Sequence, residues 1–305
     1  MFLYAVNTAL GCSLLISEEK DSIKEGIRIY ISIMIFVLLL QQVFYMVTKN
    51  YIDLHRLITF GEYESRYASV FLERWGLIRP TGIAIEPSNM GNIIVFLSVI
   101  YMLIDKKVTN RLLLFIAFSF LTFSFASIFT SALILLVLVI SRIREKNSIS
   151  LIILSTVIIV VCISFLFVFY LRFTSADAGY DAISTRLFIT DILHHRDILN
   201  DILGNGILLF NDEIILYGYP IKIYNIQDSG FFVNMYFCFG IFGLVLMLLY
   251  LYFKLSLSKY FIVTCILLMT KFDYMQPLFW MLMYFVSFFN RKPLTVNKMY
   301  LSARD

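Results

Sequence analysis

The stretch that decides the fold runs from residue 78 to residue 107 and reads IRPTGIAIEPSNMGNIIVFLSVIYMLIDKK. It begins as a polar loop with an arginine and a glutamate, becomes apolar over residues 88–104, and ends in two lysines. An apolar run of this length is close to what a helix needs to cross a lipid bilayer. The stretch therefore predicts a membrane-spanning helix that starts at a charged loop.

The composition extends this prediction to the whole chain of 305 residues. Hydrophobic residues make up 60% of it and charged residues only 15%, whereas soluble domains carry about 25% charged residues. A soluble protein of this size could not bury so much apolar surface, but a bilayer accommodates it. We expect an all-α integral membrane protein, with residues 1–305 as one polytopic domain and no nucleic-acid partner.

The four cysteines lie inside apolar runs and form no CxxC pair. Cysteines in such positions are typical of small buried hydrophobic side chains. No cluster of histidine, cysteine and carboxylate residues has metal-ligand spacing either. We therefore expect neither a disulfide nor a metal or other cofactor.

Seven apolar runs could cross the membrane, the first of them a short run at residues 1–17. Four have the length of a single helix, at residues 27–47, 88–104, 150–171 and 231–253. Two others, 112–141 and 260–289, are about 30 residues long. Each could be one tilted helix or a pair of short helices, turning at Ser124–Ser127 and at Lys271–Pro277 respectively.

The distribution of lysine and arginine favours the paired helices. With both runs paired, 15 of the 25 Lys and Arg fall on one side of the membrane, in segments 18–28, 105–111, 142–149, 254–259 and 290–305. Short basic segments of this kind mark the cytoplasmic side. This arrangement predicts about nine spans, an outer N-terminus, and two long outer loops at 48–87 and 172–230; the short helices could instead be partly re-entrant.

The first outer loop leads into the quoted helix through Pro80, Gly82 and Pro87, which exclude a continuous helix. The N–H groups at the start of the next helix then point outward, toward any anion there. Arg79 could add a forked, always charged donor to the same place. The alternative is an ordinary start of a helix with a surface pair of Arg79 and Glu86.

The second outer loop contains apolar residues at helical spacing between Ile183 and Leu203, and Gly204 supplies a stop. This pattern predicts an amphipathic helix across the outer mouth of the bundle. His195 falls on its apolar face, one turn after Asp191. Two interpretations remain open, a buried histidine paired with Asp191 and a catalytic base.

A third motif stands where the second loop re-enters the membrane. Asp228 or Ser229 could cap the following helix. Gly240 and Gly243 form a small-residue notch in that helix, at which another helix could pack closely.

Together these motifs resemble the Wzy-type O-antigen and capsular polysaccharide polymerases, which are related to the O-antigen ligases. The resemblance covers about residues 75 to 250. It is carried by Arg79, Gly82, Glu86, Pro87 and Gly91, by Arg186 with Gly204-Asn205-Gly206, by Asp228-Ser229-Gly230, and by Gly240-Ile241-Phe242-Gly243. Asp228-Ser229 stands where the ligases tend to carry His-Asn, which favours the polymerases.

The resemblance implies a GT-C-like glycosyltransferase in the bacterial cytoplasmic (inner) membrane, with its active site on the outer face. Its substrate would be an undecaprenyl-pyrophosphate-linked oligosaccharide, and membrane lipid and a chain-length regulator protein would be its partners. No cofactor is implied, because the leaving group is already activated.

The resemblance also suggests roles for individual side chains. Arg79 and Arg186, with Ser229, would bind the pyrophosphate-linked substrate. Glu86 and Asp228 are the candidates for the base, with His195 in reserve. Arg66 and Arg196 lie in the same loops but outside the motifs, so we expect no part for them in the site.

Three other functions compete with a polymerase. One is glycan transfer by a ligase, and another is a flippase or transporter that makes no bond. Transporters usually carry charged residues at mid-membrane depth and often show inverted repeats, whereas the apolar runs here are nearly free of charge. The third, a membrane acyltransferase, usually needs a histidine within the membrane, and all three histidines lie in the outer loops.

Overall fold

A computed structural model describes residues 20–67, 70–73, 75–145, 196–206, 213–216, 219–222, 229–271 and 276–289, with residues 156, 163, 193 and 226. The run expected to span at 150–171 and most of the second outer loop lie outside these residues. The count of about nine spans and the GT-C-like arrangement therefore stay predictions.

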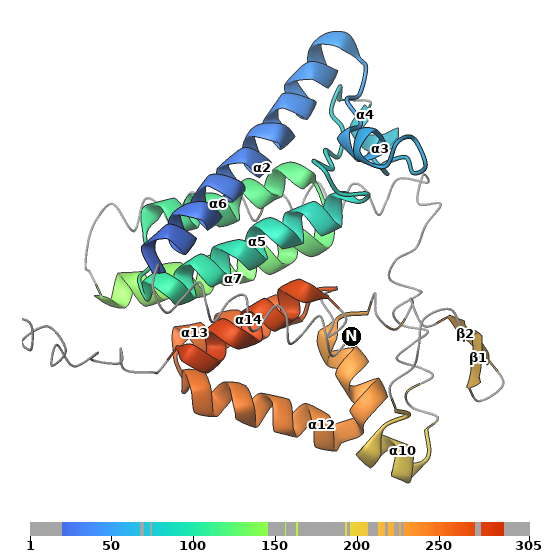
Figure 1. Cartoon of the computed structure of the whole chain (residues 1–305), viewed down its shortest axis with the longest axis vertical. Helices are drawn as coiled ribbons and strands as arrows, with labels where there is room; N and C mark the ends of the chain where they lie inside the picture. Colours follow the sequence, from blue (N-terminus) through green and yellow to red (C-terminus); the bar gives the residue numbers. More distant parts are fainter. Residues whose placement is uncertain are drawn as a thin grey trace, which may run out of the picture.

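The regular secondary structure of the described residues is helical apart from one short hairpin (Figure 1). The helices are α2 (Lys20–Thr48), α3 (Leu54–Ile58), α4 (Val70–Glu73), α5 (Pro87–Asp105), α6 (Asn110–Phe118), the 3-10 helix η1 (Ser119–Thr122), α7 (Phe125–Glu145), α10 (Ile198–Leu203), α12 (Phe231–Leu255), α13 (Lys259–Leu268) and α14 (Pro277–Phe288). Strands β1 (Glu213–Leu216) and β2 (Tyr219–Lys222) pair antiparallel, with Glu213 opposite Lys222. The sequence pattern does not predict this hairpin.

Four helices, α2, α5, α7 and α12, are long and apolar enough to cross a membrane. The outer faces of α2 and α12 also expose large apolar side chains, among them Phe36 and Phe253. Rows of such side chains are unfavourable in water and suit contact with lipid. The expected class, a helical membrane protein, is confirmed at this level.

Helix α5 lies at the centre of the bundle. It contacts α2, α6, α7, α13 and α14, and nearly all its residues are buried. A helix that is apolar on every side is expected to be buried in this way. Gly91 permits the close approach to α7, because a Cβ atom there would lie within 3.0 Å of the Ser127 side chain.

Both long apolar runs are divided, as the charge distribution predicts. The first breaks at Phe123, whose backbone is left-handed, between η1 and α7. The second breaks after α13, and α14 begins at Pro277. With its 10 residues, α13 rises only about 15 Å, roughly half the thickness of a hydrocarbon core. Neither α13 nor α14 is long enough to cross alone, which matches the re-entrant alternative.

The described parts of the basic segments 18–28, 105–111, 142–149 and 254–259 gather at one end of the bundle, which we call the basic end. Lys24 of α2 pairs with Asp105 at the end of α5 at 2.6 Å. The hydroxyl of Tyr260 in α13 donates to the carbonyl of Lys106 at 2.6 Å. Arg142 at the end of α7 contacts Asn110 at the start of α6. The charge pattern therefore predicts correctly that these four segments share one end, and the fifth, 290–305, lies outside the described residues.

Candidate functional site

Glu86 stands at the N-cap position of α5, directly before Pro87. Its carboxylate does not cap the helix. It accepts hydrogen bonds instead from Arg66 Nη1 at 2.6 Å and from the Ser88 hydroxyl at 3.2 Å. Lys271 Nζ forms an ion pair with the same carboxylate at 3.7 Å. An ion pair of arginine and glutamate therefore exists here, but the arginine is Arg66 rather than Arg79. The expectation that Arg66 takes no part at Glu86 is wrong.

The loop that presents Glu86 is attached to α2. The buried Gln41 side chain accepts from the Gly82 N–H at 2.8 Å and donates to the Gly82 carbonyl at 3.1 Å. Gly82 has a φ of +61°, which glycine adopts without strain. This clamp holds the segment before α5 against the end of α2 that lies opposite the basic end.

Asp53 organises the first half of the same loop. Its carboxylate accepts from the N–H groups of Arg56 at 3.0 Å and Ser65 at 2.8 Å. Burial acts to raise the pKa of Asp53, but these donors outweigh it and the net shift is downward. Because the folded-state pKa is lowered, this carboxylate stabilises the loop at neutral pH and loses that effect as the pH falls through its pKa.

Lys271 connects Glu86 to a cavity of about 230 Å³. The lysine lies in the break between α13 and α14, where both it and Glu86 are roughly four-fifths buried. Non-helical backbone at membrane depth is tolerated where it is buried in protein or lines a cavity. The cavity is lined by Phe125, Ala126, Phe129, Thr130 and Leu133 of α7, by Ser229, and by Ile266, Met269, Thr270 and Lys271.

Ser229 lines this cavity rather than capping α12. The N-cap of α12 is Gly230, with no side-chain hydrogen bond, so the predicted cap by Ser229 is wrong. The N–H of Phe231 donates to the Thr270 carbonyl at 3.2 Å. The structure thus brings two of the motifs, at Glu86 and at Ser229, to the same break between α13 and α14.

The other predicted site residues are only partly placed. Arg79 is half-buried in the loop before α5, and its N–H donates to the Tyr67 carbonyl at 3.1 Å. Arg186, His195 and Asp228 lie outside the described residues. Their assigned roles stay predictions.

The predicted amphipathic helix over 183–203 is wrong at Arg196 and Asp197, which are not helical. Only α10 and the single residue Leu193 are helical within the described part of that range. The stop at Gly204 is confirmed as the C-cap of α10. The apolar residues of α10, including Ile198, are exposed, so its polar side faces the protein.

Arg196 is a structural residue and not a surface charge. Helix α12 is broken at Gly240, whose φ of +63° and ψ of −165° are not helical. Arg196, with a fully buried side chain, donates to the Tyr236 carbonyl at 3.2 Å and also contacts the carbonyl of Asn200. A cation is favourable at a helix C-terminus, where unpaired carbonyls concentrate negative charge.

The loop Gly204-Asn205-Gly206 completes this end of the broken helix. The N–H of Asn205 donates to the Phe237 carbonyl, and the N–H of Gly206 donates to the Cys238 carbonyl, both at 2.9 Å. The close packing predicted at Gly240 and Gly243 is confirmed only at Gly240, where a Cβ atom would lie within 3.0 Å of the Ile202 carbonyl oxygen in α10. At Gly243 a Cβ atom would meet only Phe239 of α12 itself. The Gly204-Asn205-Gly206 motif of the resemblance therefore has a packing role in the structure.

Lys271 and Arg66 are the residues of the site that sequence reasoning missed. A signal for Lys271 exists, because only it and Asp273 are charged between residues 260 and 289. Charged residues in an apolar segment of a membrane protein often mark function. No comparable signal distinguishes Arg66 from its neighbours.

Comparisons of the chain with protein-family models, with curated proteins and with solved structures found no significant match.

Proposed function

We propose that this chain is a membrane glycosyltransferase that lengthens a glycan carried on undecaprenyl pyrophosphate. The observation that supports it best is the pair of Glu86 and Lys271 beside the cavity that Ser229 lines. A carboxylate, a cation and a hydroxyl are the groups that transfer from a lipid pyrophosphate needs. They lie at the opposite end of α5 from the basic end, which the distribution of lysine and arginine assigns to the cytoplasmic side.

The reaction exchanges one bond at the anomeric carbon for another. The oxygen of an acceptor hydroxyl attacks that carbon, and the bond from the carbon to the pyrophosphate oxygen breaks. The electron pair of that bond leaves with the pyrophosphate, and the hydroxyl proton passes to a carboxylate. Glu86 is the best-placed base among the described residues, and Asp228 and His195 are the other candidates.

Positive charge stabilises the leaving pyrophosphate as negative charge develops on its oxygens. Lys271 both pairs with Glu86 and lines the cavity, so it can exchange the carboxylate for a phosphate oxygen. Arg66, at 2.6 Å, keeps Glu86 in position during that exchange. Arg79 and Arg186 would add forked donors for the second phosphate.

The placement of charges argues against a transporter. In each of α2, α5, α7 and α12, the charged residues lie in the turns near the helix ends. Transporters place ionisable groups near the middle of the bilayer. Within the described spans, charge is available for chemistry at the surface but not along a path through the membrane.

The proposal is tested in cells that lack the chain. Single lipid-linked repeat units should accumulate on the outer face, where an impermeant oxidant of sugars reaches them. Wild-type chain should restore a ladder of longer glycans. Glu86→Gln and Lys271→Gln should each lower polymerisation by roughly 100- to 1000-fold, the usual cost of losing one electrostatic contact in a transition state.

Glu64→Gln is the matched control, because Glu64 is an exposed carboxylate of the same loop that pairs with Arg56 at 3.0 Å, and it does not line the cavity. It should polymerise like wild type. Repeat units that stay inaccessible from outside would identify a flippase instead. A full-length polymer that is not transferred to its final acceptor would identify a ligase. Either result refutes the proposal.

A further inference from the structure

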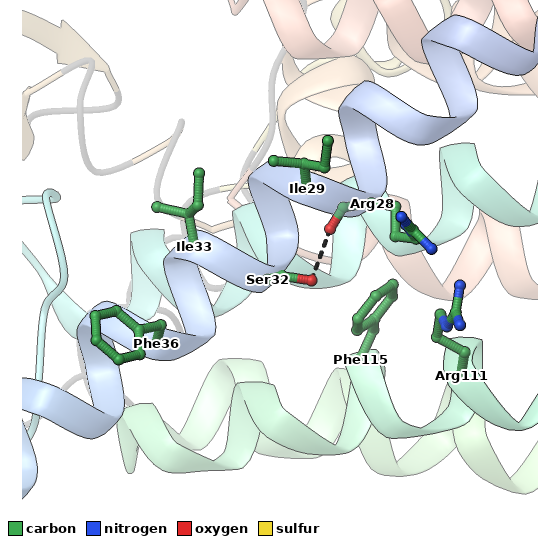
Figure 2. A pocket seen from close by; sticks show the side chains of 7 residues that line it. All are labelled: Arg28, Ile29, Ser32, Ile33, Phe36, Arg111 and Phe115. Carbon is green, nitrogen blue, oxygen red and sulfur yellow. Dashed lines mark hydrogen bonds between the residues drawn. The ribbon is translucent and has the colours of Figure 1, made fainter.

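A groove of about 500 Å³ opens between α2 and α6 at the basic end. It lies at the opposite end of the bundle from Glu86 and shares no residue with the cavity beside Lys271. Its volume falls within the range of small-molecule sites, about 300 to 1,000 Å³. The groove is lined by Arg28, Ile29, Ser32, Ile33 and Phe36 of α2 and by Arg111 and Phe115 of α6 (Figure 2).

Two arginines from different helices converge on one end of this groove. Figure 2 shows the side chains of Arg28 and Arg111 directed toward the same space, next to the Phe115 ring. Arg28 pairs with Glu25 on its own helix, while none of the described residues forms an ion pair with Arg111. Like charges that converge repel each other unless an anion lies between them. Two guanidinium groups also provide the forked donors that suit a phosphate.

The rest of the groove is apolar and continues onto the outer face of α2. Ile29, Ile33 and Phe36 line it, and each is at least half exposed in the protein. From Arg28 to Phe36 the helix rises about 12 Å. The groove thus runs from two cations at the level of the membrane surface to an apolar wall at the level of the acyl chains.

We infer that this groove binds one anionic phospholipid, with its phosphate between Arg28 and Arg111 and an acyl chain along Ile29, Ile33 and Phe36. A free anion would not need the apolar wall, and an uncharged lipid would leave Arg111 without an anion, since only Arg28 has a carboxylate beside it. The basic end is the end assigned to the cytoplasmic leaflet, where anionic lipids attract clustered arginine and lysine. This inference does not depend on the proposed glycosyltransferase activity.

Native mass spectrometry of the purified full-length chain tests the site directly, with phosphatidylglycerol and phosphatidylcholine of identical acyl chains as probes. One phosphatidylglycerol should bind about tenfold more tightly than phosphatidylcholine. Arg111→Gln should raise the dissociation constant of phosphatidylglycerol at least tenfold, since a hydrogen bond to a charged group is lost. Lys107→Gln, the matched control, removes an exposed charge at the same end that does not line the groove, and should change it less than about twofold.

Ile33→Trp is a second variant that fills the groove without touching either arginine, and it should also weaken phosphatidylglycerol binding. Thermal unfolding of each variant checks that the protein is folded. Equal effects of Arg111→Gln and Lys107→Gln would show diffuse charge attraction. Equal binding of the two lipids, both of which carry a phosphate, would show that the net negative charge of the lipid is not recognised. Displacement of the lipid by inorganic phosphate would identify a site for a free anion. Each of these three results overturns the inference.

Discussion

At the scale of single residues, arginines of the two long loops that look alike in sequence differ in role. Arg56 forms an exposed ion pair with Glu64, whereas Arg66 holds the carboxylate of Glu86 at the start of α5. Arg196 is fully buried and satisfies carbonyls where α12 is broken. The charge is the same in all three. Arg56 and Arg66 both stay exposed and differ in their partners, since Glu64 is exposed and Glu86 is mostly buried, whereas Arg196 has exchanged its water for backbone carbonyls.

Arg196→Met should destabilise the protein by about 2–4 kcal/mol, because it removes the charged donor that Arg196 supplies to the carbonyls of Tyr236 and Phe237 in the broken helix. Thermal unfolding in detergent should show a fall of the midpoint by roughly 5–10 °C. Arg56→Met is the control and should lower the stability by less than about 1 kcal/mol, as expected for an exposed pair. Equal shifts in the two variants would show that Arg196 does not hold the break.

At the scale of elements, the breaks inside apolar segments matter more than the spans. The break at Phe123 and the one after α13 allow short helices to turn within the bundle. The break at Gly240 bends α12, and Figure 1 shows the two parts of that helix running in different directions. At Gly240 and after α13, carbonyls near the break accept from N–H groups elsewhere in the chain, those of Asn205, Gly206 and Phe231. The site at Glu86 depends on the break after α13, because Lys271 lies in it.

Gly240→Ala should destabilise the protein by at least about 3 kcal/mol, because a side chain is strained at this φ and ψ and its Cβ would overlap the Ile202 carbonyl. Gly26→Ala in α2 is the matched control. A Cβ at Gly26 meets no atom within 4 Å, so alanine there should stabilise the helix by up to about 1 kcal/mol. Thermal unfolding compares the two variants, and a mild effect of Gly240→Ala would mean that α12 is continuous.

At the scale of the whole molecule, the bundle has two chemically different ends. The basic end joins α2, α5, α6, α7 and α13 through polar contacts of lysines and arginines or the residues beside them. The opposite end carries the ordered first loop, Glu86 and the cavity beside Lys271. A protein that meets different molecules on the two faces of a membrane needs this kind of asymmetry.

Single cysteines placed at Glu62 and at Lys107 should test the orientation. Both positions are exposed and lie at opposite ends of the bundle. Ser65, in the same loop as Glu62, is a poorer choice because it is only 7% exposed and would label poorly at either face. In intact cells, an impermeant thiol reagent should label the cysteine at 62 and leave the one at 107 until the membrane is opened. Labelling of 107 from outside would reverse the orientation and move the proposed site to the cytoplasmic face.

The sequence by itself determined the properties that depend on local hydropathy. These are the membrane class, the helices over 27–47 and 88–104, the helical segment over 231–253 without its break at Gly240, and the division of both long apolar runs. The bilayer imposes a fixed thickness, so apolar length along the chain translates directly into helices. The gathering of the basic segments at one end follows from the same alternation of helices and loops.

Only the tertiary structure decided which charged groups meet. Glu86 pairs with Arg66 and with the distant Lys271, and Arg196 is buried against the break in α12. Such contacts depend on how far a helix continues before it bends and on which loop covers its free carbonyls, and neither is encoded by hydropathy. Sequence spacing places residues along an element, but packing between elements decides which partner a charged side chain meets. Between packed elements the charge loses its water, so a charged side chain without a partner there is costly.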